Sequence, residues 1–225
     1  MTRFSNLEKL AMLLILLVAG MIMCRVVYAG SLMYVFLLWN IFLAWIPFKL
    51  SLGIGRQSNR WLSALIFMSW LLFFPNALYI ITDLIHLEER TNVPLLYDAL
   101  MLYSSATTGL LLAFTSLYKI ELFLCSRFKS NAANKIAIVL LFLGSFGVYA
   151  GRFLRWNSWD IVTDPFILTT AMGKRFLYPH LHTHTWSITL ILTILFSILY
   201  FSFRELPKFL QEKAGHDQLK VNAHT

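Results

Sequence analysis

Charged residues are scarce in this 225-residue chain, in which Asp, Glu, Lys and Arg make up 13% of the sequence. A soluble domain has about 25% charged and about 45–50% apolar residues, whereas 58% of this chain is hydrophobic. The excess apolar surface must therefore face something other than water. This composition indicates that the chain lies in a lipid bilayer, and we expect the bilayer to be its partner.

Cysteine is almost absent as well, since Cys24 and Cys125 are the only two. In the topology predicted below they lie near opposite membrane faces, roughly 30 Å apart, which is far beyond the reach of a disulfide. The sequence also lacks a phosphate-binding loop, a nucleotide-binding glycine fingerprint, a nucleophile elbow and an HExxH zinc motif. The sequence motifs therefore indicate no cofactor and no reaction.

Lys and Arg outnumber Asp and Glu by 19 to 11, but they form no continuous basic patch with exposed aromatic residues. They lie between apolar runs instead, as in the loops of membrane proteins. We therefore expect no nucleic acid among the partners, and the sequence leaves the oligomeric state open. Glu121 and Lys119 are expected to form a pair at the membrane surface, with both side chains reaching water.

Six apolar runs are long enough to cross a bilayer, because each contains about 20 mostly apolar residues. The predicted spans are residues 7–23, 32–48, 61–83, 95–117, a fifth from 136, and 186–203. Between the last two spans, Asp164-Pro165 is typical of a helix start and predicts an interfacial or re-entrant helix. The predicted fold is an all-α polytopic integral membrane protein, with residues 1–205 as one transmembrane domain and 206–225 as a charged cytoplasmic tail.

The distribution of basic residues predicts the orientation of these spans. Thirteen of the nineteen Lys and Arg residues fall on the side of the two termini in the six-span arrangement. The cytoplasmic side of a membrane protein carries the excess of Lys and Arg, so both termini are predicted to be cytoplasmic. Arg3 and Lys9 would also fit a signal peptide, but Arg25 after the first apolar run argues against cleavage. We therefore expect a multi-pass protein of the cell inner membrane.

The third predicted span carries a polar stripe. Asn76, Tyr79, Asp83 and His86 are three or four residues apart, which places them on one face of a helix. Polar and ionisable groups are costly within a bilayer, so the stripe indicates a functional site. Pro75 is expected to kink this helix and to free a backbone carbonyl, so the amide of Asn76 would serve either that carbonyl or a polar site.

The predicted topology brings other polar residues to the same, outer end of the helices. Asp98 begins the fourth span, Arg152 and Arg155 end the fifth, and Asn157 and Asp160 follow in the connection after it. Arginine guanidinium groups suit either the carboxylates of this set or the phosphate of a ligand. In the fifth span itself, the repeated glycines at 144, 147 and 151 predict a close contact with another helix.

Three functions are compatible with this outer-face cluster. The leading one is binding of a small polar or anionic ligand, or of a lipid headgroup, by Asn76, Tyr79, Asp83, Asp98, Arg152, Arg155, Asn157 and Asp160. An alternative is a membrane-embedded enzyme that acts on a lipid-linked substrate, with Asp83 or His86 as acid or base. The third is a structural or assembly protein in which Arg152 and Arg155 only pair with Asp83, Asp98 or Asp160.

Three alternating histidines, His180, His182 and His184, precede the sixth span. On an extended segment they would face one side, where they could hold Zn²⁺ or Cu²⁺ together with a carboxylate such as Asp83. Exposed loop histidines are the commoner explanation of such a pattern. We therefore predict no metal site, with these three residues as the candidates if there is one.

Two motifs in the chain resemble a known family signature. The sequences PNALYIITD at 75–83 and GRFLRWNSWD at 151–160 are similar to the pair PNxxYxxTD and GRFxRxNSWD of bacterial predicted membrane proteins grouped as domain of unknown function 1361. The resemblance covers most of the chain from the second to the sixth span, although Leu78 stands where family members usually have Pro. It implies a multi-span membrane protein, implies no substrate, and draws attention to Asn76, Asp83, Arg152, Arg155, Asn157 and Asp160.

Overall fold

The computed structural model describes residues 2–55, 57, 59–89, 93–128, 132–156, 163 and 165–223. These residues fold into helices, and no strand occurs among them. The long helices are α1 (Thr2–Ala29), α2 (Phe36–Ile54), α3 (Arg60–Tyr79), α4 (Leu95–Phe128), α5 (Ala133–Phe153), α7 (Pro165–Leu177) and α8 (Thr183–Ala223). Two 3₁₀ helices, η1 (Ile80–His86) and η2 (Pro179–His182), directly follow α3 and directly precede α8.

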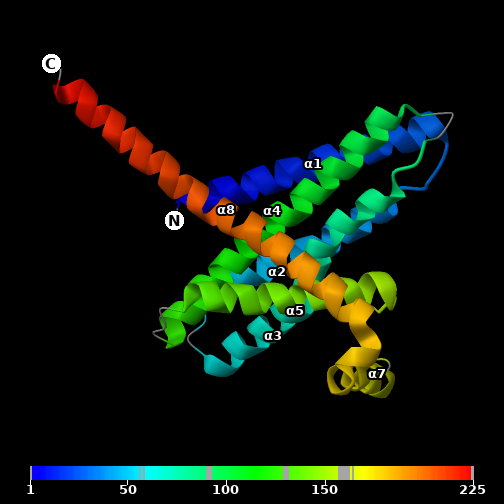
Figure 1. Cartoon of the computed structure of the whole chain (residues 1–225). Helices are drawn as coiled ribbons and strands as arrows, with labels where there is room; N and C mark the ends of the chain where they lie inside the picture. The colour runs from blue at the N-terminus through cyan, green and yellow to red at the C-terminus, as the bar shows by residue number, and fades with distance from the viewer. Residues whose placement is uncertain are drawn as a thin grey trace.

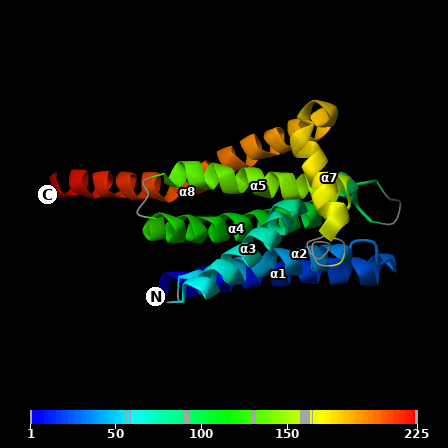
Figure 2. The same ribbon diagram turned by 90° about the horizontal axis from the view of Figure 1, so that it is seen from below.

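Six helical segments in the described part of the chain are long and apolar enough to cross a membrane. They are Asn6–Ala29, Phe36–Ile54, Arg60–His86, Leu95–Phe128, Ala133–Phe153 and Pro179–Pro207. Figures 1 and 2 show them side by side in one bundle, with α7 lying across the others near the start of α8. The prediction of six spans, with a further helix between the fifth and sixth, is confirmed, and the chain is an all-α polytopic membrane protein.

Apolar side chains both fill the bundle and cover its outside. The fully buried rings of Trp70 and Phe74 in α3 stack with centroids 4.5 Å apart. The indole nitrogen of Trp70 donates to the hydroxyl of Ser116 in α4 at 3.3 Å, which satisfies the polar end of this ring. Large apolar side chains on α1 and α8, such as Leu13 and Ile191, are exposed. These outer faces are the surface that a bilayer would cover.

Helices α3 and α5 approach closely where a glycine of α5 meets the proline of α3. A Cβ atom added at Gly147 would lie 2.4 Å from Cγ of Pro75, and one at Gly151 would lie 3.4 Å from the Tyr79 ring. Because the proline ring is rigid, a side chain at position 147 would force the two helices apart. The close helix contact predicted from the glycines of the fifth span is thus confirmed.

The polar stripe continues from α3 into η1. A 3₁₀ helix has about three residues per turn, so residues three apart lie directly above one another. Asp83 and His86 therefore stay on one face even though the α-helix ends at Tyr79. This end of the bundle, which we call the Asp83 end, also contains the start of α4 and the end of α5.

The last helix continues past its membrane-spanning part. Helix α8 runs unbroken from Thr183 to Ala223, whereas its apolar span ends at Pro207. Figure 1 shows the C-terminal part of α8 extending away from the other helices. The segment predicted as a charged tail is therefore helical as far as Ala223. Its cytoplasmic location, and the single transmembrane domain before it, remain predictions.

Candidate functional site

A buried ion pair joins η1 to α5 at the Asp83 end. The Arg152 Nη2 atom donates to Oδ1 of Asp83 at 2.5 Å, and the Nδ2 atom of Asn40 in α2 donates to Oδ2 at 2.7 Å. The Asp83 side chain is 2% exposed and that of Arg152 is 14% exposed. Both carboxylate oxygens thus have a donor, as a buried carboxylate requires. The pairing of Arg152 with Asp83, one of the predicted pairs, is confirmed.

The guanidinium group of Arg152 has further partners. Its Nε and Nη2 atoms donate to the Thr82 hydroxyl at 3.0 and 2.7 Å, and Nη1 lies 3.3 Å from Nε2 of His86. Arginine only donates, so this contact is a hydrogen bond in the tautomer of His86 whose Nε2 carries no proton. Cζ of Arg152 lies 4.4 Å from the centroid of the Tyr79 ring, which is a cation–π contact. Arg152 is therefore held on several sides.

Asp98 belongs to a second ion pair and not to the first. Arg25 in α1 donates to both carboxylate oxygens of Asp98, from Nε at 2.7 Å and from Nη2 at 3.0 Å. Tyr34 connects the two pairs, since Arg25 lies 4.4 Å from the centroid of its ring and its hydroxyl donates to the carbonyl of His86 at 2.7 Å. The Asp83 end therefore holds two linked but separate ion pairs.

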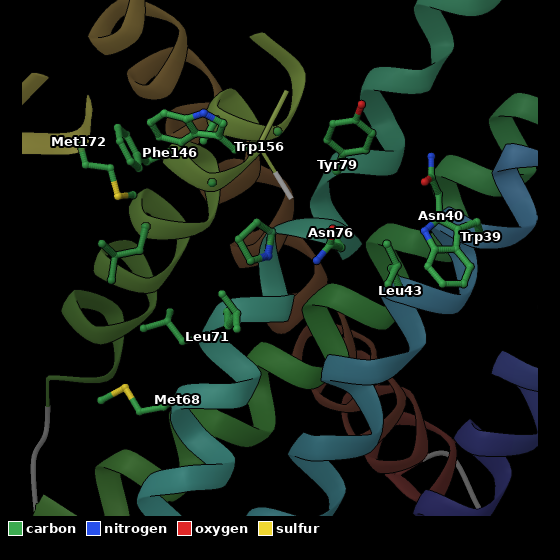
Figure 3. A pocket seen from close by; sticks show the side chains of 16 residues that line it. Trp39, Asn40, Leu43, Met68, Leu71, Asn76, Tyr79, Phe146, Trp156 and Met172 are labelled. Atoms are coloured by element: carbon green, nitrogen blue, oxygen red, sulfur yellow. The ribbon is translucent and has the colours of Figure 1, made fainter. Parts of the chain in front are cut away.

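A cavity of about 470 Å³ adjoins the Asp83–Arg152 pair. Its walls come from α2, α3, α5, the start of the connection after α5, and α7. Asn40 and Tyr79, which contact Asp83 and Arg152, also line this cavity. Figure 3 shows Asn40, Asn76, Tyr79 and Trp156 towards one end of the cavity, and the apolar side chains of Leu71 and Met68 towards the other.

Asn76 has a local role as well as a place in the cavity wall. Its Nδ2 atom donates to the carbonyl of Phe73 in the same helix at 3.2 Å, just before Pro75. Pro75 frees the carbonyl of Leu71, four residues before it, so this bond to Phe73 is a local backbone contact but not the one predicted from the proline. The same side chain borders the cavity, so the two roles coexist.

The remaining predicted ligand residues lie apart from the ion pair or outside the described residues. Arg155 is exposed and forms no ion pair with any residue that the structure describes. Its φ of +58° is left-handed, a common way to end a helix, and it turns the chain so that Trp156 reaches the cavity. Asn157 and Asp160 fall outside the described residues, and their predicted roles therefore remain predictions.

The three histidines before the last span do not lie on an extended segment. His180 and His182 belong to η2 and His184 to the first turn of α8, so the alternation that would align their side chains is lost. His184 packs edge-on against Phe153, with ring centroids 5.4 Å apart. Within the described ranges, no group of three or more His, Cys, Asp or Glu side chains is placed to hold a metal ion.

A third charged cluster lies about 34 Å from Asp98 along α4, at 1.5 Å per residue. Glu121 is buried and accepts hydrogen bonds from the Tyr200 hydroxyl at 2.6 Å and from Arg204 Nη1 at 2.9 Å, both in α8. The expectation that Glu121 reaches water at the membrane surface is therefore wrong. It faces α8, where two donors compensate its burial.

At the Asp83 end, four members of the two linked ion-pair clusters are not among the candidate residues predicted from the sequence: Arg25, Tyr34, Asn40 and Thr82. Asn40 carried a usable signal, because an amide in the middle of an apolar span needs a partner. Arg25 carried one too, as a charge at the end of the first span. Thr82 carried one as a fixed position of the PNxxYxxTD motif, whereas Tyr34 carried none, since tyrosine is common at helix ends.

These features define the class of the protein, which is a multi-pass membrane protein with polar clusters buried between its helices. A family model described as a protein of unknown function, DUF1361, matches residues 39–199, and the chain belongs to this family. The match includes Asn40, Asp83 and Arg152 but not Arg25. No curated protein and no solved structure matches the chain.

Proposed function

We propose that this protein binds a small polar or anionic ligand, or the headgroup of a lipid, beside the Asp83–Arg152 pair. The observation that carries the proposal is that the ion pair and the cavity share two side chains. Asn40 donates to Asp83 and the Tyr79 ring covers Arg152, while both residues line the cavity. A polar molecule at this end of the cavity would meet side chains that are already held in place.

The Tyr79 hydroxyl is the group best placed to contact such a ligand. It makes no hydrogen bond to any other described residue, whereas its ring is fixed on the Arg152 guanidinium group. Asp83 is 2% exposed, and Asn40 and Arg152 already donate to its two oxygens. The ligand would therefore bind to Tyr79 and to the amide side chains of the cavity wall. Asp83 would not touch the ligand but would hold Asn40 and Arg152 in position.

Charges around the cavity favour an anion. Asp83 and Arg152 neutralise each other, and Arg175 in α7 adds a further cation, with Cζ 5.7 Å from the centroid of the Trp156 ring that lines the cavity. The Nε atom of Arg175 is buried and has no hydrogen-bond partner in the described part of the chain. Nη1 of Arg175 donates to the Ala171 carbonyl at 2.8 Å, and a phosphate or carboxylate would offer the acceptor that Nε lacks.

Binding accounts for the geometry better than catalysis or a purely structural role. An acid or base must reach its substrate, but Asp83 is buried and Nε2 of His86 faces Arg152. An ion pair that only joined helices would need no cavity beside it. The excess of basic residues towards the termini supports an orientation with the Asp83 end outside the inner membrane and both termini in the cytoplasm.

A pair of tyrosine variants tests the headgroup site. Tyr79→Phe and Tyr97→Phe each remove one hydroxyl, but Tyr79 lines the cavity, whereas the Tyr97 hydroxyl donates to the Met21 carbonyl at 2.7 Å. Native mass spectrometry of the full chain in detergent, titrated with dodecanoyl lysophosphatidylglycerol, measures the apparent Kd. We expect Tyr79→Phe to raise this Kd by roughly 2- to 13-fold, as the loss of one hydrogen bond worth about 0.5–1.5 kcal/mol.

The matched control decides what such a change means. We expect Tyr97→Phe to bind the lysolipid like the wild type, because its hydroxyl serves only the backbone of α1. Equal Kd values for the two variants would contradict the proposed site.

A further inference from the structure

The composition of the cavity changes along its length. Towards the Asp83 end the wall contains Asn40, Asn76 and Tyr79, whereas Met68 and Leu71 line the opposite end (Figure 3). Met68 and Tyr79 are eleven residues apart on α3, which corresponds to about 16 Å at 1.5 Å per residue. The polar groups of the wall thus lie towards one end, among the rings of Trp39, Phe146 and Trp156, and the other end is apolar over a length of several methylene groups.

The apolar end opens to the outside of the bundle within the membrane-spanning segments. Met68 is 61% exposed, and Leu143 on α5 is exposed as well. Both residues lie inside segments that are long and apolar enough to span the membrane. The rim of the cavity at this depth therefore faces lipid chains, and a molecule from the bilayer can enter sideways.

Small residues on α5 create the space. Gly147, Ala150 and Gly151 form part of the wall where longer side chains would fill the cavity. The packing of Gly147 on Pro75 keeps α3 and α5 close, so the space lies beside this contact and is built into the fold. Packed membrane helices leave few empty volumes, and one of about 470 Å³ is within the range of about 300–1,000 Å³ for small-molecule sites.

We infer that the apolar end of this cavity holds one hydrocarbon chain of a membrane lipid, whose anionic headgroup occupies the polar end. This inference rests on the proposed function for the headgroup and adds the class of ligand, an amphiphile taken from the bilayer. The inference is based on the match between the cavity and a lipid: polar side chains lie where the headgroup would be, and apolar side chains lie where the hydrocarbon chain would be. A lipid oriented in this way keeps its headgroup at the level of Arg152 and its chain at the level of Leu71.

A pair of tryptophan variants on α3 tests this inference. Met68→Trp narrows the apolar end, whereas Leu65→Trp adds the same ring to a side chain that is 64% exposed and does not line the cavity. The full chain in detergent receives an equimolar mixture of lysophosphatidylglycerols with dodecanoyl, tetradecanoyl, hexadecanoyl and octadecanoyl chains. Native mass spectrometry then gives the ratio of bound octadecanoyl to bound dodecanoyl lipid for each variant in a single spectrum.

We expect Met68→Trp to lower this ratio at least about fourfold, the effect of removing one methylene group from the site, while Leu65→Trp keeps the wild-type ratio. Leu143→Trp narrows the same end from α5 and is expected to lower the ratio too, which guards against a folding defect in one variant. Tyr79→Phe should weaken binding of all four lipids by the same factor and leave the ratio unchanged.

These variants separate the failure of the inference from the failure of the proposed function. If the ratio of bound octadecanoyl to bound dodecanoyl lipid were the same in Met68→Trp, Leu143→Trp and Leu65→Trp, the site for the hydrocarbon chain would be overturned. The headgroup site would still stand if Tyr79→Phe weakened binding. A lowered ratio in Met68→Trp and Leu143→Trp, with wild-type binding by Tyr79→Phe, would support the chain site and contradict the headgroup contact.

Discussion

Two arginine–aspartate pairs at the same end of the bundle differ in what surrounds them. Arg25 and Asp98 join α1 to α4 through two parallel hydrogen bonds, and neither side chain is more than 2% exposed. Arg152 and Asp83 join α5 to η1, but Arg152 is partly exposed and the residues that hold the pair also line a cavity. The same two residue types thus form a helix clamp in one place and the back wall of a candidate site in the other.

The difference shows that a buried ion pair in a membrane helix is not by itself a sign of function. A charged residue among apolar helices needs a partner whatever its role, because an unpaired charge there is costly. What distinguishes the second pair is that Asn40 and Tyr79 connect it to open space. Function is therefore assigned from the cavity and from the side chains that it shares with the pair.

The largest expected effect comes from removing one partner of the enclosed pair. Asp98→Ala leaves Arg25 buried without a counter-charge and is expected to lower the free energy of unfolding by about 3–5 kcal/mol. Asp83→Ala is expected to cost less, about 1–3 kcal/mol, because Arg152 keeps Thr82 and His86 and is open to solvent or ligand. Chemical denaturation of the purified protein in detergent measures both values.

A double variant serves as the control for this prediction. Replacing both partners, with Arg25→Met and Asp98→Leu, should recover most of the lost stability, because no unpaired charge remains. A greater loss of stability in Asp83→Ala than in Asp98→Ala would reverse the comparison between the two pairs.

A smaller effect is expected from the contact that shapes the cavity. Gly147→Ala places a Cβ atom 2.4 Å from the Pro75 ring and should cost about 1–3 kcal/mol, as overpacked sites do. Gly53→Ala is the matched control, since a Cβ atom added there meets nothing within 4 Å and alanine favours the helix. Thermal unfolding of the two variants in detergent checks the difference, and equal midpoints would show that α3 and α5 are not locked together at this point.

The sequence predicts the end of the bundle at which Asp83, Asp98 and Arg152 lie, but not which side chains pair there. The positions of Asp83, Asp98 and Arg152 along their spans follow from apolar periodicity and topology. Which helices are neighbours does not follow from them, so the sequence predicts one cluster with both Asp83 and Asp98, whereas Asp98 pairs with Arg25 of α1. Glu121 was misplaced for the same reason, because its partners lie in α8, far away in the sequence.

The local backbone conformation is the second feature in which the structure differs from the prediction made from the sequence. The change from α-helix to 3₁₀ helix after Tyr79 keeps Asp83 and His86 aligned, but nothing in the sequence from Ile80 to His86 marks it. The three alternating histidines needed an extended chain, and the structure folds that segment into helix instead. The cavity could not be predicted from the sequence, because it depends on how α2, α3, α5 and α7 pack.

A density map of the protein purified with its native lipids tests the central claim most directly. We predict elongated density in the cavity from Tyr79 down to Met68, with its wider end beside Tyr79 and Arg152 and with no matching density at the Arg25–Asp98 pair. A map in which side chains fill the cavity, or in which lipid density is confined to the outer faces of the helices, would contradict the account.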